Sequence, residues 1–278
     1  MATIVGAVTT SHVPSIGGAI ARHQEESDYW KPFFDGFDAI HAWLREAKPD
    51  VAVVIYNDHG LNFFLDKMPT FAVGAAGEYR NADEGWGIPV LPPFPGDPAL
   101  SWHIIETLVG RDFDPVTCQE MLVDHAFTLP MKLLFPDAAA WPVRSVPVCI
   151  NTVQHPLPSA ARCYRLGQAI GDAIRAWPGD ARVLVVGSGG LSHQLDGKRA
   201  GHINKEFDLK FMESLTEDPE WATRFTNREL IAEVGTQGIE LLMWLAARGT
   251  LGPRARRVHS NYHIPISNTA GGTMLLAA

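Results

Sequence analysis

The sequence predicts an α/β domain of layered architecture, in which helices flank a mixed, largely parallel central sheet. Short runs of consecutive apolar and β-branched residues recur along the chain, and such runs are typical of strands buried on both faces. Longer stretches with apolar residues at helical spacing lie between them, which favours parallel strands joined by helices. Because no repeat or sharp change in composition marks a boundary, residues 1–278 are expected to form a single domain.

The elements follow from these runs in chain order. Strands are expected at residues 3–8, 51–56, 70–73, 146–150 and 183–186, and helices at 30–47, 98–108, 159–177 and 230–247. The first helix should end before Lys48-Pro49, because a residue that precedes proline disfavours helical geometry. The third opens at Ser159, a good N-cap, and ends at Pro178-Gly179. Residues 85–98 are rich in proline and indicate a long irregular loop.

Composition excludes several classes of protein. The chain carries 23 Lys+Arg against 31 Asp+Glu, a net charge of −8, which repels phosphate backbones and anionic lipid. Nucleic acid and membranes are therefore not expected partners, and no apolar run approaches the roughly 20 residues of a membrane span. The N-terminal residues resemble a strand, not a signal peptide, and the three cysteines form no CxxC pair. A reducing, cytoplasmic location is expected.

Three histidines follow the ends of expected strands. His12 follows the strand at 3–8, His59 the strand at 51–56, and His193 the strand at 183–186. Ligand sites of open α/β sheets form beyond the carboxyl ends of strands, so these imidazoles converge if their strands are neighbours. Glu240 is the one carboxylate of a strongly apolar stretch in the last expected helix. A buried carboxylate needs a partner or a metal, whereas the alternative is that Glu240 faces solvent or pairs with an arginine.

Two histidines and one carboxylate are the ligand set of non-haem Fe(II) oxygenases, which leaves positions open for substrate and O₂. A zinc-dependent hydrolase or lyase needs similar ligands, although the HExxH signature is absent. The segment Gly187-Ser188-Gly189-Gly190 also follows an expected strand, but it lacks the lysine of a phosphate-binding loop and the full GxGxxG. A tight turn that needs positive φ is the simpler interpretation of these glycines.

An ordered set of motifs then resembles one family over nearly the whole chain. The motifs are Thr10-Ser11-His12-Val13-Pro14, Tyr56-Asn57-Asp58-His59, Ala82-Asp83-Glu84-Gly85-Trp86-Gly87, Val123-Asp124-His125, Gly189-Gly190-Leu191-Ser192-His193-Gln194-Leu195, Asn204-Lys205-Glu206-Phe207-Asp208, Gly238-Ile239-Glu240-Leu241 and Tyr262-His263-Ile264-Pro265-Ile266-Ser267-Asn268-Thr269. Together they are similar to class III extradiol ring-cleaving dioxygenases, and most of all to the catalytic beta subunit of protocatechuate 4,5-dioxygenase.

The resemblance implies roles for individual residues. His12, His59 and Glu240 match iron ligands, so Fe(II) is the expected cofactor. His193 matches the catalytic acid/base, and His125 a second active-site histidine near the substrate hydroxyls. Ser267 matches a position that contacts the substrate carboxylate. Ser267 and Asn268, close to a possible helix start, are expected to supply donors for it.

The activity implied is extradiol (meta) cleavage of a catecholic acid with O₂. Protocatechuate, cleaved to 4-carboxy-2-hydroxymuconate semialdehyde, is the first expectation, and gallate or 3-O-methylgallate are alternatives. Heteromeric members of the family have a small alpha subunit that closes the site, and others carry a fused domain. This chain ends at Ala278 without such a domain, so we expect either an alpha partner in a homo- or hetero-oligomer or a more open site.

The sequence also bears on a rival hypothesis and on the other histidines. A non-catalytic partner subunit on an old enzyme fold is a rival hypothesis, but all four central residues (His12, His59, His193 and Glu240) are present. The other histidines are expected to be surface or hydrogen-bonded polar residues, except His263, which lies in a matching motif. The remaining set is His23, His41, His103, His155, His202 and His259.

Overall fold

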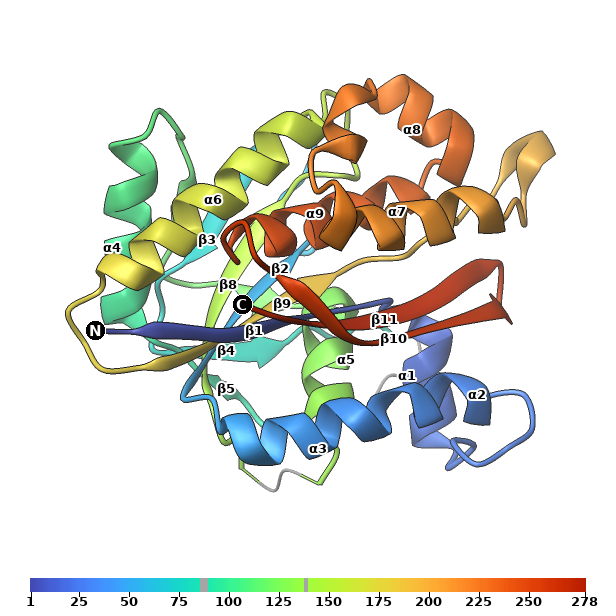
Figure 1. Cartoon of the computed structure of the whole chain (residues 1–278), viewed down its shortest axis with the longest axis horizontal. Helices are drawn as coiled ribbons and strands as arrows, with labels where there is room; N and C mark the ends of the chain where they lie inside the picture. The colour runs from blue at the N-terminus through green and yellow to red at the C-terminus, as the bar shows by residue number, and fades with distance from the viewer. Residues whose placement is uncertain (86–89, 138–139) are drawn as a thin grey trace.

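The computed structural model describes residues 1–85, 90–137 and 140–278, and within them the main element is an eight-stranded mixed sheet (Figure 1). Its strands, in spatial order, are β10 (Arg256–Ile266), β11 (Thr269–Ala277), β1 (Thr3–Thr10), β9 (Arg182–Ser188), β2 (Val51–Tyr56), β8 (Arg144–Ile150), β3 (Phe71–Gly74) and β6 (Val116–Cys118). The four central strands β1, β9, β2 and β8 are parallel, while β11 and β3 run antiparallel to their inner neighbours. The predicted mixed, largely parallel sheet is confirmed.

The sheet is buried on both faces, which explains the uninterrupted apolar runs. All six residues of β2 are buried. Successive side chains of a strand point to opposite faces, so Val53 and Ile55 enter one core and Val54 and Tyr56 enter the other. The strand thus joins two separate apolar layers.

Helices cover each face (Figure 1). One layer holds α4 (Pro98–Val109), α6 (Ala160–Ala176), α7 (Lys205–Glu217), α8 (Asn227–Val234) and α9 (Leu241–Gly249). The other holds α1 (Pro14–Ala21), α2 (Lys31–Phe34), α3 (Asp38–Ala47) and α5 (His125–Leu134). The predicted flanking of the sheet by helices is confirmed.

A second, three-stranded sheet lies beside the first. Its order is β5 (Phe94–Pro95), β4 (Glu78–Asn81) and β7 (Leu122–Val123). Part of the expected irregular loop therefore forms β5, and residues 86–89 of that loop, with the Trp86-Gly87 end of one motif, lie outside the described residues. The small sheet matters for function because the chain leaves β4 toward Glu84 and leaves β7 directly into Asp124 and His125.

The first three expected helices are present, with local differences. The stretch at 30–47 forms α2, a short 3₁₀ turn and α3, and it ends at Lys48 in the left-handed conformation, before Pro49. The side chains of Asp97 and Ser159 cap α4 and α6 by accepting hydrogen bonds from main-chain N–H groups three residues on.

The prediction of one helix over 230–247 is wrong. The chain leaves α8 at Gly235, whose φ is +91°, and a 3₁₀ turn at Gly238–Glu240 precedes α9. A Cβ atom on Gly235 would lie 2.3 Å from the His193 carbonyl oxygen, so this break brings the chain against the His193 main chain. The apolar residues keep helical spacing on both sides of Gly235, so the sequence alone predicts one helix. The contact between Gly235 and the His193 main chain breaks the helix there.

The expectation of a helix start near Ser267 is also wrong. Ser267 and Asn268 form the turn of the β10–β11 hairpin, because Ile266 pairs with Thr269 across it. Ser267 has a φ of +58°, the positive value that tight two-residue hairpin turns require. The hairpin lies at the edge of the main sheet, and its turn reaches the end where the strands β1, β9 and β2 also finish (Figure 1).

Within the described residues, no single helix has the length and apolar character to cross a membrane. The bent pair of Asn227–Val234 and Gly238–Gly249, which meets at 118°, passes such a test by length and composition only.

Candidate active site

The carboxyl ends of three adjacent strands carry the predicted histidines. β1, β9 and β2 are neighbours and parallel, so they all end at the same edge. His12 lies two residues after β1, His59 three after β2 and His193 five after β9. All three line one cavity of about 920 Å³. The convergence expected from the sequence is therefore present.

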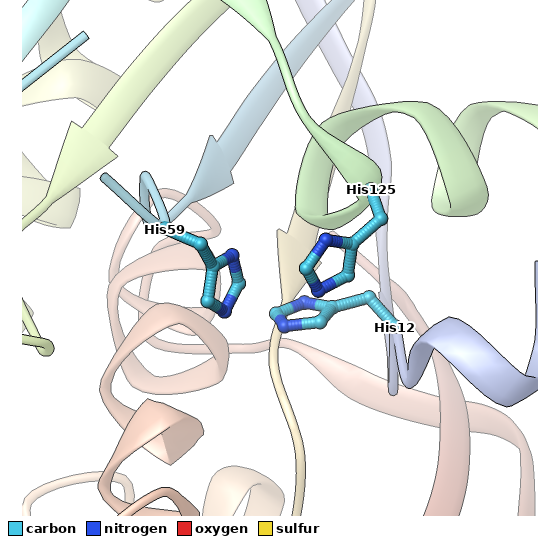
Figure 2. A group of neighbouring side chains, drawn as sticks. All are labelled: His12, His59 and His125. Atoms are coloured by element: carbon cyan, nitrogen blue, oxygen red, sulfur yellow. The ribbon is translucent and has the colours of Figure 1, made fainter. Parts of the chain in front are cut away.

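His12 and His59 form a cluster with His125, the first residue of α5 (Figure 2). Each imidazole offers one nitrogen, and these nitrogens lie within 4.8 Å of one another. The His59 and His125 rings stack with centroids 4.3 Å apart, and the His12 ring meets His59 and His125 edge-on at 5.4 and 5.3 Å. Figure 2 shows the three rings turned toward a common centre.

Glu240 is buried against two of these imidazoles. Its Oε2 lies 3.3 Å from His12 Nε2, and its Oε1 lies 3.6 Å from His59 Nε2. The main-chain N–H of Gly190 donates to Oε2 (3.0 Å), and the Asn57 side-chain amide donates to Oε1 (3.2 Å). Glu240 therefore neither faces solvent nor pairs with an arginine, and the alternative interpretation of this residue is wrong.

Hydrogen bonds at Nδ1 orient both imidazoles. The Asp124 carboxylate accepts from His59 Nδ1 at 2.7 Å and from the His59 main-chain N–H at 2.9 Å. His12 Nδ1 lies 2.8 Å from the Ser188 hydroxyl, which itself donates to the Ala126 carbonyl and so accepts from the imidazole. Each ring consequently turns Nε2 toward Glu240. Metal-binding histidines are typically held in this way, through a hydrogen bond at the other ring nitrogen.

The charges of the cluster favour a cation. Burial alone would raise the pKa of Glu240, but the adjacent His12 and His59 hold that pKa well below its ordinary value. Desolvation opposes charge on His59, but the carboxylates of Asp124 and Glu240 outweigh it and raise the His59 pKa to about 10. The carboxylates thus stabilise a positive charge at the place where the nitrogen and oxygen atoms would bind a metal. A bound metal would displace the proton from the imidazole.

His125 has a carboxylate partner of its own. Glu84 accepts from His125 Nδ1 at 2.6 Å and from the His125 main-chain N–H at 2.7 Å. Burial lowers the pKa of His125, although Glu84 opposes this shift. Its Nδ1–H is therefore fixed on Glu84, and Nε2 remains for a contact within the cavity.

His193 reaches the cavity from the loop after β9. Its main chain is anchored because His193 N–H donates to the Val234 carbonyl (2.7 Å), and its carbonyl accepts from Gln237 and Gly238. The side chain is buried, and Nε2 has no hydrogen-bond partner within the described residues. Burial lowers the His193 pKa to about 4, so the ring is neutral at pH 7. In the tautomer that carries its proton on Nδ1, this unpartnered Nε2 is a proton acceptor available for chemistry.

The two residues expected to hold the substrate carboxylate differ in position. Ser267 lines the cavity, whereas Asn268 is not among the described residues that line it, and both are exposed. The Ser267 main-chain N–H already donates to the Tyr29 hydroxyl (3.1 Å). Six of the seven predicted site residues thus surround one cavity, and Asn268 lies outside it.

The glycines at the end of β9 and directly after it serve close packing. None of the three glycines in Gly187–Gly190 has positive φ, so the expectation of a turn that requires it is wrong. A Cβ atom on Gly189 would lie 2.4 Å from the Glu240 carbonyl oxygen, and one on Gly187 would lie 2.8 Å from Ala247 Cβ. These positions let α9 and its preceding turn approach the strand, which places Glu240 beside the histidines.

The remaining histidines lie away from the cavity, and among those in the described residues only His259 has a buried ring nitrogen, Nε2, without a hydrogen-bond partner. His41, His103 and His202 each place Nε2 within 3.0 Å of a main-chain carbonyl oxygen. His23 and His155 are exposed, while His259 and His263 lie half-buried on β10. None of these seven is among the residues found to line the cavity.

Comparison with known proteins shows the family of the chain. Residues 6–271 match the family described as the catalytic LigB subunit of aromatic ring-opening dioxygenase. The chain belongs to this family. Dioxygenases of the LigB family are metal-dependent, in agreement with the histidine and carboxylate cluster described above.

Relatives within the LigB family carry several substrate names. Gallate dioxygenase of Pseudomonas putida is 42% identical over 195 residues, which cover 70% of this chain and 57% of that protein. The 2,3-dihydroxyphenylpropionate/2,3-dihydroxicinnamic acid 1,2-dioxygenase of Photorhabdus laumondii is 32% identical over 72% of this chain and 60% of its own length. The chain therefore spans less than two thirds of these two relatives. The enzyme of that name from Rhodococcus jostii is 26% identical, over 96% of each chain.

A solved structure shares the fold. An uncharacterized protein from Escherichia coli K12 superposes with a TM-score of 0.61 at 15% identity, over 98% of this chain and 99% of the other. This likeness confirms the α/β architecture.

Two carboxylates of this LigB-family site were not singled out as functional in the sequence. Glu84 and Asp124 appeared there only as members of matching motifs, but each holds one histidine by two hydrogen bonds. Asp124 immediately precedes His125, and an acidic residue beside a histidine was the available signal. Glu84 lies 41 residues from its partner, so only the fold reveals the pair.

Proposed function

We propose that this chain is a non-haem Fe(II)-dependent extradiol dioxygenase, which opens the ring of a catecholic acid with O₂. One observation carries the proposal: Glu240 lies between His12 Nε2 and His59 Nε2, at 3.3 and 3.6 Å, in a cavity that also contains His125 and His193. Membership of the LigB family supports ring-opening chemistry at this cavity.

The donor set suits ferrous iron. His12, His59 and Glu240 would hold the ion, and two imidazoles with one carboxylate are typical of non-haem Fe(II) oxygenases. Both imidazoles have Nδ1 engaged and Nε2 turned inward, which is the tautomer that a ligand needs. When bound, iron supplies open coordination positions and the redox capacity that O₂ activation requires.

The other two histidines handle protons. His193 Nε2 is buried and unpartnered, so it is suited to take a phenolic proton from the diol and to return a proton later in the cycle. His125 keeps Nδ1–H on Glu84, and its Nε2 is then able to orient a substrate hydroxyl. Ring cleavage beside the two hydroxyls incorporates both oxygen atoms. It yields a muconic semialdehyde where the cleaved carbon outside the diol carries hydrogen, as in protocatechuate, and a second carboxylic acid where that carbon carries a hydroxyl, as in gallate.

The substrate is proposed to be a catechol that bears a carboxylate. The name of the relative with 42% identity favours gallate, and protocatechuate lacks only one hydroxyl of that ring. The phenylpropionate relatives favour a carboxylate on a side chain. A small alpha subunit that completes the site, and the oligomer it would form, remain predictions.

Oxygen uptake tests the proposal directly. The protein is purified without oxygen, loaded with Fe(II) and ascorbate, and offered gallate, protocatechuate, 3-O-methylgallate, 2,3-dihydroxyphenylpropionate and catechol. We expect uptake of one O₂ per ring and a yellow product with at least one of the acids. His12→Ala and Glu240→Ala should lose both iron and uptake. Tight zinc binding with no uptake after iron loading would instead support the hydrolase or lyase alternative.

A further inference from the structure

The cavity carries one fixed positive charge among its described lining residues. Apart from histidines, the charged residues that line it are Arg22, Asp83, Glu84 and Glu240. A substrate carboxylate that enters this acidic protein therefore meets three carboxylates and a single guanidinium. Like charges repel, so an anionic substrate is favoured by a local cation.

Helix α1 carries Arg22 along the cavity wall. The helix begins at Pro14, two residues after His12, and Arg22 follows its last residue. Ser15, Gly18 and Arg22 have the i, i+3, i+7 spacing of one helix face, and all three line the cavity. One side of this short helix thus connects the histidine cluster at its start with a cation at its end.

The Arg22 side chain folds back toward the start of the helix. A Cβ atom on Gly18 would lie 3.1 and 3.2 Å from the two terminal guanidinium nitrogens, so the guanidinium rests over the bare main chain of Gly18. Gly18 is about one helical turn, ~5 Å along the axis, beyond Ser15. The charge is therefore set about one turn away from the end of α1 that lies beside His12.

The guanidinium is free to bind a ligand. Its Nε donates to the Gln24 side chain (3.1 Å), and within residues 1–85, 90–137 and 140–278 no carboxylate lies within 4.0 Å of it. The terminal nitrogens of Arg22 make no hydrogen bond in the same described ranges. A planar guanidinium with both terminal nitrogens free matches a carboxylate with two parallel hydrogen bonds.

Ser15 supplies an independent observation on the same helix face. Its hydroxyl oxygen is buried and has no hydrogen-bond partner within the described residues. A buried hydroxyl without a partner is costly, and a ligand oxygen would satisfy it.

We infer that Arg22, with the Ser15 hydroxyl about one helical turn away on the same cavity-lining face, binds the carboxylate of the aromatic substrate and selects anionic catechols over neutral ones. The inference rests on the proposed function for the identity of the ring, but not for the anion contact itself. Arg22 would contact the carboxylate together with Ser267, whose main-chain N–H already donates to the Tyr29 hydroxyl.

A pair of uncleavable ligands tests the anion contact without turnover. 4-Hydroxybenzoate and 4-hydroxybenzamide have nearly the same shape and differ in charge. Their binding to the Fe(II)-loaded protein is measured by calorimetry in the absence of oxygen. We expect the wild type to prefer the benzoate, and Arg22→Gln to reduce that preference by about 5-fold, because Arg22 is an exposed residue and solvent screens its charge. Arg22→Lys should retain part of it, because it keeps the charge and loses the planar fork.

Arg165→Gln is the matched control, because Arg165 is exposed on α6 and is not among the residues that line the cavity. Its removal should leave the preference for 4-hydroxybenzoate over 4-hydroxybenzamide as in the wild type. The ratio of kcat/KM for protocatechuate to that for 3,4-dihydroxybenzamide should fall in the same order among the variants. Equal binding of both ligands to the wild type, or an unchanged preference in Arg22→Gln, overturns the inference. Absence of oxygen uptake with every catechol would overturn the proposed function alone, because the binding measurement does not depend on turnover.

Discussion

The Asp124 carboxylate holds His59 at two points, the ring Nδ1 at 2.7 Å and the main-chain N–H at 2.9 Å. The other oxygen of the same carboxylate accepts from the Ala126 main-chain N–H at 3.0 Å and caps α5. One buried side chain therefore sets the orientation of a proposed metal ligand and begins the helix that carries His125. The positions of His59 and His125 are coupled through it.

Asp124→Asn should weaken Fe(II) binding by about 10- to 100-fold, the usual effect of losing a carboxylate that orients a histidine ligand. Asparagine still caps a helix, so α5 should form. The measurement is an anaerobic Fe(II) titration. Asp97→Asn is the control, because Asp97 caps α4 in the same manner away from the cavity, and it should leave iron affinity unchanged. Equal iron affinity in Asp124→Asn and the wild type would contradict this role.

Glu84→Gln distinguishes between two roles for His125, contact with the substrate and ligation of the metal. If His125 contacts the substrate, loss of the paired carboxylate should lower kcat/KM by about 10-fold or more and leave one iron bound per chain. The three-histidine cluster makes the comparison informative, because His125 nitrogen lies within 4.8 Å of those of His12 and His59. Iron content and kcat/KM are measured on the same sample. A loss of iron in Glu84→Gln would place His125 among the metal ligands instead.

His193→Phe should retain iron and lose roughly 100-fold or more in turnover, the usual contribution of general acid–base catalysis. Phenylalanine fills a similar volume, and the loop is held mainly by main-chain hydrogen bonds to Val234 and Gly238, so the fold should persist. Oxygen uptake and circular dichroism check both points. Turnover within a few-fold of the wild type would remove His193 from the proton-transfer role.

The strand ends and their histidines were predictable because each strand contains a run of mainly apolar residues and each histidine follows within five residues of its end. Parallel pairing then places them at one edge without further information. Glu240 was singled out for its charge in an apolar stretch, but the break at Gly235 was not foreseen, because the apolar pattern of α9 continues the helical spacing of α8. Only the close approach to His193 explains the break.

Pairs distant in the sequence could not be predicted. Glu84 and His125 meet only because β4 and β7 pair in the small sheet, and both strands are too short for a clear pattern. Arg22 shows no signal in the sequence either, since its importance comes from the bare surface of Gly18 and the cavity beside it.

Asp208 should make stability depend on pH. It is buried, accepts hydrogen bonds from Ser192 and from the Tyr262 hydroxyl, and burial raises its pKa from 3.8 to about 6. A raised pKa means that the folded state favours the protonated form. Its stabilising contribution is therefore present below pH 4 and is lost as pH rises through 6, by about 3 kcal/mol.

Asp208→Asn should remove that dependence, so the stability of the wild type relative to the variant should fall between pH 4 and pH 7. Urea unfolding of the metal-free protein across this range measures it. Asp38→Asn, at an exposed position of α3, controls for the loss of one carboxylate. Parallel stability curves for Asp208→Asn and the wild type would show that the Asp208 pKa is not raised.

Gly189→Ala tests whether close packing behind the site sets the position of Glu240. A Cβ atom at residue 189 would lie 2.4 Å from the Glu240 carbonyl oxygen and 3.0 Å from Glu240 Cβ, so the turn before α9 must move. Overpacking of this kind costs about 1–3 kcal/mol of unfolding free energy.

The displacement should also weaken Fe(II) binding by about 10-fold or more, because the carboxylate would leave its place beside His12 and His59. Gly77→Ala is the matched control, since a Cβ there meets no atom within 4 Å, and it should change neither quantity. A simple loss of stability would leave the Fe(II) affinity of the folded protein intact. The Fe(II) titration is therefore made at a temperature where both variants are folded. An unchanged affinity in Gly189→Ala would mean that Glu240 is positioned by its hydrogen bonds to Asn57 and Gly190 and not by its contact with residue 189.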